Sequence, residues 1–281
     1  MLSKFIPYIL IIFAIIIIVI AISSIANYYF NRSANKEVEN LLSKSESADE
    51  KIIKEADIKS LPSSVQKWLE FSQVLGKEGI ITIKVDQKAE MRLKKEQAWM
   101  PLTARQYFTT NEPGFIWIAK IKAAPLIHIV GKDKYVDGKG NMLIKIMSLV
   151  TVADGKGKEV DQGTLLRFLA ETVWFPTAAL EDYIKWEEIN DNSAKATMTY
   201  GNVKASGIFT FGDNGEVKNF AAQRYKELDG EYSLETWSID VSAYKDFSGI
   251  KIPTKGEIIW KLAEGDFNWY NFKVLNVEYY T

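Results

Sequence analysis

The chain has 281 residues, and its 35 Lys plus Arg nearly balance its 36 Asp plus Glu, for a formal net charge of −1. Proteins that track nucleic-acid phosphates are normally basic, so we expect no nucleic-acid partner. The chain has no Cys and only one His, His128, which excludes disulfides, Cys nucleophiles and Cys-containing zinc clusters and leaves His128 as the single residue that could serve a His-based triad. With 47% hydrophobic residues it can bury a substantial core, and we expect one folded domain with appendages, without metal or cofactor.

The N-terminus predicts a membrane anchor. Residues 5–26 carry no charge, and a helix of that length reaches roughly 33 Å, enough to cross a bilayer core. We assign residues 1–30 to a transmembrane helix, and Tyr28, Tyr29 and Phe30 suit an interfacial aromatic belt. The alternative is a cleaved signal peptide, because Ser24-Ile25-Ala26 has the small-x-small form of a cleavage site.

The orientation of this anchor rests on few charges. Lys4 and the amino terminus stand on one side, and Arg32 and Lys36 stand on the other, so the positive-inside rule is nearly balanced. N-terminal anchors with short leaders commonly export the domain attached to them. We therefore expect a single-pass protein whose domain lies outside the cytoplasm.

A charged segment comes after the anchor. Residues 31–60 are rich in Lys and acidic residues, which indicates a solvated, partly helical spacer. A coiled coil or partner helix is the alternative, but no heptad pattern persists for three repeats. An amphipathic helix over residues 61–71, with Pro62 at an early position, then opens the domain, and Gly76 suits its end.

From residue 79 onward the hydrophobic pattern has a period of two, as where Ile81, Ile83 and Val85 alternate with polar residues. Turn sequences such as Glu112-Pro113-Gly114 and Asp213-Asn214-Gly215 separate the alternating segments. Short strands joined by such turns predict an antiparallel meander of roughly ten to twelve strands.

One segment inside the meander has helical spacing. Residues 161–174 place apolar side chains at 165, 166, 168, 169 and 173, with Asp161 or Thr164 as the expected cap, and Phe175-Pro176 ends the helix. Residues 61–281 are therefore expected to form a mainly β (α+β) domain. Its antiparallel sheet would curl, or form a half-open β-barrel, with helices covering it.

The C-terminal strands are apolar on both faces from Phe267 to Tyr279. This pattern predicts burial on both sides, as when a helix or a lipid-like ligand fills the concave face.

Several strings resemble an uncharacterised family of prokaryotic, often membrane-anchored proteins. They are Leu61-Pro62 to Leu69, Trp99-Met100-Pro101, Pro113 to Trp117, Gly131-Lys132-Asp133, Glu171 to Ala178, and Ile252-Pro253-Thr254. The resemblance covers about residues 61–280, and Trp174-Phe175-Pro176-Thr177-Ala178 is its most specific part. It implies fold and topology but no activity. At the level of fold, the meander with covering helices also resembles the half-open barrels of bacterial lipoprotein carriers and other lipid-binding proteins.

Glu171 is the strongest polar candidate. It lies four residues after Arg167 on the inserted helix, which is compatible with a surface ion pair. Apolar neighbours favour an inward position instead, where a strand cation, Arg92, Arg105 or Arg224, would neutralise the carboxylate. Such a cluster either pins the helix to the sheet or orients a ligand head group.

Aromatic residues are the second candidate, either as ordinary core or as the lining of a cavity for an acyl chain, isoprenoid or other apolar ligand. Together with the Glu171 argument, they give one predicted ligand-binding set: Trp99, Arg105, Tyr107, Trp117, Glu171, Trp174, Phe175 and Arg224.

Other polar motifs have ordinary interpretations. Asp133 and Asp137 lack calcium-loop spacing and are interpreted as turn residues. His128 is expected to be a core or surface residue, and Gly155-Lys156-Gly157-Lys158 lacks the spacing of a phosphate loop.

Three functions remain open. The favoured one is a membrane-anchored, non-enzymatic domain of the cell envelope that binds or transfers a lipid-like apolar ligand. The second is a structural or partner-binding module of an envelope complex. The third is a hydrolase or isomerase that uses Glu171 with Asp133 or Asp161, although the sequence shows no nucleophile–base pair.

Overall fold

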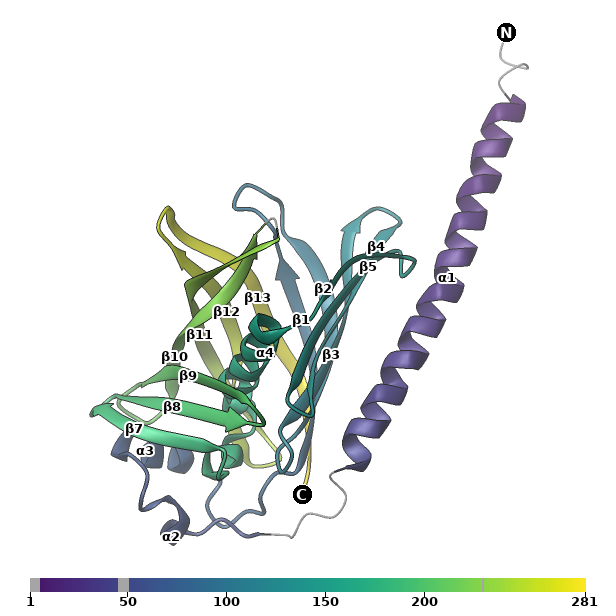
Figure 1. The fold of residues 1–281 in the computed structure, drawn as a ribbon. Helices are drawn as coiled ribbons and strands as arrows, with labels where there is room; N and C mark the ends of the chain where they lie inside the picture. Colours follow the sequence, from purple (N-terminus) through teal and green to yellow (C-terminus); the bar gives the residue numbers. More distant parts are fainter. Residues whose placement is uncertain (1–5, 45–50, 229) are drawn as a thin grey trace.

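The computed structural model describes residues 6–44, 51–228 and 230–281 (Figure 1). Its body is one antiparallel sheet of 13 strands in the order β6-β5-β4-β3-β2-β1-β13-β12-β11-β10-β9-β8-β7. The sheet curls into a half-barrel around a helix, as the sequence predicts, although it has more strands than expected. It is a meander whose first and last strands, β1 and β13, pair in the middle of the sheet.

The strands have these bounds: β1 Thr82–Met91, β2 Met100–Thr109, β3 Gly114–Ala124, β4 Ile127–Val136, β5 Lys139–Ile146, β6 Val150–Gly155, β7 Ile184–Asn190, β8 Ser193–Tyr200, β9 Val203–Phe211, β10 Val217–Leu228, β11 Glu231–Phe247, β12 Ile250–Leu262 and β13 Gly265–Tyr280. In β2 the buried and exposed residues alternate, so the even-numbered positions face the concave side.

Helix α1 spans Ile6–Ser43 and is long and apolar enough to cross a membrane, or to serve as a signal sequence. It continues past the expected anchor of residues 1–30 into the residues expected to form the spacer. Val38 and Leu41 on this continuation pack against Ile116 on the convex face of the sheet. Glu37 forms ion pairs with Lys132 and Lys134 of β4.

The last part of the expected spacer belongs to the folded body. Ile53 and Ile58 are buried in the main core, and α2 covers Glu55–Ile58. The amide of Gly79 donates a hydrogen bond to the carbonyl of Lys51 over 2.8 Å. The rest of the spacer, residues 45–50, lies outside the described residues.

Helix α3, Ser63–Phe71, forms where the amphipathic pattern predicts it, and its Trp68 is fully buried. The Trp68 ring lies 5.9 Å from that of Phe209 in β9. Across from Trp68, the β4–β5 turn meets the β8–β9 turn. The rings of Tyr135 and Tyr200 are 6.4 Å apart there. Side chains therefore fill this end of the half-barrel.

Helix α4, Lys158–Glu171, lies inside the half-barrel and is followed by two short 3₁₀ helices, η2 Thr172–Trp174 and η3 Pro176–Leu180. The predicted cap is wrong, because Gly157 is the N-cap residue and no side chain caps the helix. Asp161 instead accepts a hydrogen bond from the amide of Gly140 over 2.7 Å, which ties α4 to β5. A Cβ at Gly140 would lie 2.4 Å from Thr164 Oγ1, so only glycine permits this contact.

Two β-bulges explain why β13 looks apolar on both faces. Asp86 pairs with Asn276 and Gln87 with Val274, which leaves Leu275 as the extra residue, and Leu275 is exposed. Ile258 pairs with Tyr270 and Ile259 with Asn268, so Trp269 is extra in the same way. The expectation of burial on both faces is thus wrong at Leu275, because a bulge shifts the alternation by one residue.

Candidate functional site

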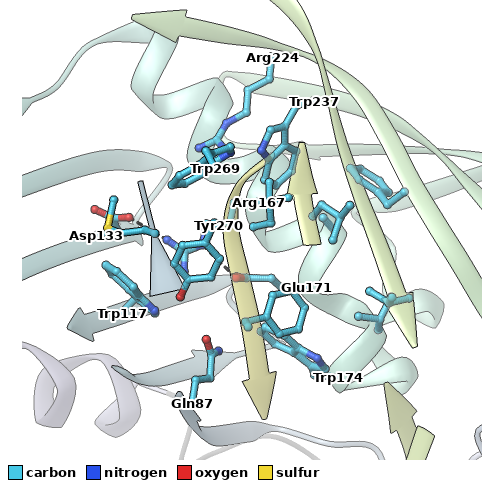
Figure 2. A pocket seen from close by; sticks show the side chains of 18 of the residues that line it. Gln87, Trp117, Asp133, Arg167, Glu171, Trp174, Arg224, Trp237, Trp269 and Tyr270 are labelled. Atoms are coloured by element: carbon cyan, nitrogen blue, oxygen red, sulfur yellow. Dashed lines mark hydrogen bonds and ion pairs between the residues drawn. The ribbon is translucent and has the colours of Figure 1, made fainter. Parts of the chain in front are cut away.

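The half-barrel contains a cavity of about 180 Å³ between α4 and the concave face of the sheet. Most of its lining is apolar, but two arginines, two carboxylates and a glutamine also face it: Arg167, Arg224, Asp133, Glu171 and Gln87. Figure 2 shows these side chains pointing into one space, with tryptophans around them. A mostly apolar cavity with a few convergent polar groups is typical of a small-molecule site.

Arg167 joins the two acidic residues. Its Nη1 lies 2.8 Å from Asp133 Oδ2, and its Nε lies 2.9 Å from Glu171 Oε1. The guanidinium carbon is also 5.1 Å from the ring centre of Phe115 and 5.0 Å from that of Trp117. Helix α4 therefore holds a cation between two carboxylates and two aromatic rings.

Gln106 of β2 completes the hydrogen bonding of Glu171. Its Nε2 donates to Glu171 Oε2 over 2.7 Å, while its Oε1 accepts from Arg167 Nη2 over 3.4 Å. Both oxygens of Glu171 thus have a partner. Such mutual satisfaction is what a buried charged network requires for stability.

Burial is the largest influence on the ionisation of these groups. It raises the pKa of Glu171 and of Asp133 above their ordinary values, although Arg167 partly opposes the increase. Burial, together with repulsion from Arg167, lowers the pKa of Arg224 to about 10. The cavity therefore disfavours charge on all three side chains.

Arg224 of β10 differs from Arg167 in its contacts. Its guanidinium carbon lies 4.4 Å from the ring centre of Trp237, a cation–π contact. Within the described ranges, the acidic side chains of the cavity pair with Arg167, and no ion pair joins Arg224 to a carboxylate. A Cβ at Gly163 of α4 would lie 3.3 Å from Arg224 Nε, so this glycine leaves room for the guanidinium.

Four tryptophans share the cavity. Trp117, Trp174, Trp237 and Trp269 all line it. In the part of the chain that the structure describes, none of their Nε1 atoms has a hydrogen-bond partner, although each is buried. Buried donors without an acceptor are rare in native proteins, so a group of four on one cavity calls for an explanation.

Residues 51–272 match the model of a family described as a family of unknown function, DUF6544. The chain belongs to this family. The match confirms the resemblance to an uncharacterised family that the sequence motifs indicate.

Among solved structures, the chain is similar to a LolA superfamily protein from Nitrosomonas europaea, with 11% identity and a TM-score of 0.43, over 78% of this chain and 93% of that one. It is also similar to a putative outer membrane lipoprotein-sorting protein domain from Vibrio parahaemolyticus, with 7% identity and a TM-score of 0.40, over 78% of this chain and 91% of that one. No curated protein matched the sequence.

The structure brings half of the predicted ligand-binding set of this DUF6544 protein to the cavity: Trp117, Glu171, Trp174 and Arg224. Glu171 points inward as expected, but its main cation is Arg167 of its own helix rather than a strand arginine.

The other four lie elsewhere. Arg105 and Tyr107 are on the convex face of β2, where Arg105 pairs with Asp86 and Tyr107 packs near α1. Trp99 lies beneath Arg92 near the β1–β2 turn, at 4.5 Å. Phe175 is a core residue whose ring centre is 4.7 Å from that of Phe108.

The predicted ligand-binding set leaves out Asp133, Gln106, Trp237 and Trp269, although Asp133 is a possible partner of Glu171 in the enzyme hypothesis and both tryptophans belong to the aromatic candidates. The interpretation of Asp133 as a turn residue is wrong, because β4 continues to Val136 and Asp133 forms an ion pair with Arg167. The alternation of apolar residues along β2 would have placed Gln106 on the same buried face as Leu102 and Ala104. No local signal reveals the bulge that turns Trp269 toward the cavity.

Other polar residues stay outside this site. Asp137 is in the β4–β5 turn and pairs with Lys44, the residue that follows α1, at 2.7 Å. His128 Nε2 lies 3.1 Å from Ser148 Oγ, and burial lowers the pKa of this imidazole. Among the described residues, no group of three or more His, Cys, Asp or Glu is placed to hold a metal ion.

Proposed function

We propose that this protein is a membrane-anchored, non-enzymatic binding protein of the cell envelope that holds an amphiphilic molecule in the half-barrel. The apolar part of the ligand lies along the concave wall. Its acceptor oxygens, from a carboxylate, phosphate or ester, meet Arg224 and the indole N–H groups.

The main support is the set of four buried indole donors. No acceptor from the described chain reaches them. In this proposal, a bound molecule supplies the acceptors after a small shift of the indole rings. A buried polar group without a partner costs about 1–3 kcal/mol, and the cost adds up over donors that share one cavity. Because indole N–H and guanidinium only donate, the ligand must supply acceptors.

Arg224 contributes a charge to the site. Asp133 and Glu171 are both hydrogen-bonded to Arg167, so of the two arginines in the described lining of the cavity, Arg224 is the one available to a ligand. A buried guanidinium is stabilised best by an anionic oxygen group, which it binds with two parallel hydrogen bonds. The ligand is therefore expected to be anionic at one end.

The anchor supports a location at a membrane. Residues 6–26 of α1 are apolar and almost entirely exposed, as expected for a segment that lipid surrounds. We place the β domain outside the cytoplasm, as expected for an exported N-terminal anchor. A cleaved signal peptide remains the alternative for this segment.

The geometry gives less support to an enzyme. Both oxygens of Glu171 are engaged in hydrogen bonds, by Arg167 and by Gln106. Asp161, one of its two expected catalytic partners, is bonded to the Gly140 amide at the junction of α4 and β5, and does not line the cavity. The cluster is arranged to be stable rather than to exchange a proton.

The test is to purify the full chain from membranes and to identify extracted molecules by mass spectrometry. We expect the wild type to carry an anionic amphiphile in near-stoichiometric amount. Arg224→Met should lose most of it, whereas Arg105→Met, which changes an exposed arginine on the convex face, should keep it. Stoichiometric protein partners without a bound amphiphile would instead favour a partner-binding module, and equal content in both variants would contradict the role of Arg224.

A further inference from the structure

One end of the half-barrel collects several turns. Met91 pairs with both Met100 and Tyr270, which places the β1–β2 turn beside the β12–β13 turn. A row of paired residues then crosses the sheet from Leu102 through Ile121 and Ile129 to Ile146. The β3–β4 and β5–β6 turns therefore lie at this same end. We call it the rim, and Figure 1 shows its turns at the upper end of the sheet.

The rim exposes large apolar side chains. Leu93, Leu126, Ile127, Leu149 and Val150 are all exposed, and Leu126 at the β3–β4 turn reaches 73%. Turns in water normally carry polar residues. Apolar side chains gathered at neighbouring turns indicate a surface that something other than water covers.

Helix α1 shows what lies next to the rim. Ser23 Oγ donates a hydrogen bond to the carbonyl of Met147 over 2.8 Å, and Ser148 Oγ donates to Asn27 Oδ1 over 3.3 Å. The β5–β6 turn is thus held against the last residues of the apolar segment. The rest of that segment continues beyond the rim, as Figure 1 shows. A bilayer that surrounds residues 6–22 has its surface at the level of these turns.

Charge supports the same partner. Lys94 and Lys95 lie in the β1–β2 turn together with Glu96, Lys122 lies near the end of β3 and Lys120 two residues before it, and all four lysines are exposed. Apolar side chains flanked by lysines are typical of surfaces that enter the interfacial region of a bilayer, where lysine contacts anionic head groups.

We infer that the rim is a second membrane contact: the turns β1–β2, β3–β4 and β5–β6 enter the interfacial layer of the bilayer that α1 spans. The inference rests on the proposed anchoring of α1. Met91, Ile121, Ile144 and Trp269 line the cavity and lie close to the rim turns, so the cavity extends toward the same surface. An amphiphile can then pass between bilayer and cavity without crossing water.

The chain has no Cys, so a single introduced Cys carries a fluorescent probe at one known position. The full chain is placed in nanodiscs of zwitterionic and anionic phospholipid. Probes replace Leu126 and Val150 at the rim, and Ile189, an exposed residue on edge strand β7, provides the matched control. A fourth probe, Ile15→Cys, reports on the anchor. Quenching is measured with nitroxide lipids and with aqueous iodide.

We expect nitroxide lipids to quench the Leu126→Cys and Val150→Cys probes at least about fivefold more strongly than the Ile189→Cys probe, and iodide to show the opposite order. The inference is overturned if the rim probes behave like the Ile189→Cys probe while the Ile15→Cys probe is quenched by lipid. If the Ile15→Cys probe is also quenched only by iodide, the anchoring itself fails, and the rim contact fails with it.

Discussion

Arg167 Nε donates a hydrogen bond to Glu171 Oε1 over 2.9 Å, one turn further along α4, and only 16% and 11% of the two side chains are exposed. Pairs with this spacing usually lie on an exposed helix face and contribute little. Here the same guanidinium also holds Asp133 of β4, so one cation fixes a helix to the sheet. The cluster is therefore expected to matter for stability, and Arg224 is expected to matter for binding.

Arg167→Met should destabilise the protein by about 3–5 kcal/mol, because it leaves two buried carboxylates without their cation. The free energy of unfolding from denaturant titration is the measurement. Arg105→Met is the matched control, since the exposed Arg105–Asp86 pair should contribute less than about 1 kcal/mol. Equal losses in the two variants would show that the buried cluster has no special role.

Glu171→Gln should flatten the pH dependence of stability. Burial raises the folded-state pKa of Glu171 above its unfolded value, so the folded state binds more protons between the two values. The stability contribution of this group is therefore greatest at low pH and falls as pH rises from about 4.3 through the raised pKa. Between pH 4 and pH 8, the free energy of unfolding of the wild type should fall relative to that of Glu171→Gln as pH rises. A wild type that gains stability relative to Glu171→Gln with rising pH would contradict the raised pKa.

Arg224→Met should leave the protein as stable as the wild type or more stable, while it weakens ligand binding. Burial lowers the pKa of Arg224 to about 10, so the folded protein disfavours its charge. Residues retained at a cost to stability are characteristic of binding sites. Thermal unfolding of ligand-stripped protein checks this, and a large loss of stability would mean that Arg224 supports the fold instead.

Glu37→Gln should loosen α1 from the convex face. Burial favours a raised pKa for Glu37, but hydrogen bonds from Lys132 and Lys134 outweigh it and lower the pKa. Hydrogen bonds to charged groups contribute about 1.5–3 kcal/mol. Spin labels at Arg32→Cys and Val152→Cys should therefore give a broader distance distribution in the variant. Glu39→Gln, at an exposed position on the same helix, should leave the distribution unchanged.

The docking of α1 should also depend on pH. A lowered carboxyl pKa gives stability that is present above the unfolded value of about 4.3 and is lost as pH falls through the folded value. The same label distances should broaden below about pH 4. A distribution that stays narrow down to the lowest pH at which the β domain remains folded would show that packing of Val38 and Leu41 alone holds the helix.

Much of the fold can be predicted from local patterns in the sequence. The period of two around Ile83 predicts strands, and the spacing of Leu165, Leu166 and Leu169 predicts the inserted helix, because each pattern matches one secondary structure. Curling of a long meander is expected from the need to bury one face.

The site itself depends on information that local patterns lack. The alternation of β2 places Gln106 on the buried face, but it does not show that Glu171 and Arg167 of α4 meet Gln106 there. Asp133 resembles a turn residue until the full length of β4 is known. Trp269 reaches the cavity through a bulge, and a bulge depends on pairing with a distant strand.

A crystal structure of the full chain, purified from its own membrane without delipidation, is the sharpest test of ligand binding in the half-barrel. We predict elongated electron density in the cavity between α4 and the concave sheet, with its polar end within hydrogen-bonding distance of Arg224 and of at least one of the indoles of Trp117, Trp174, Trp237 and Trp269. A cavity that contains only water, or that side chains fill completely, would contradict the proposed function.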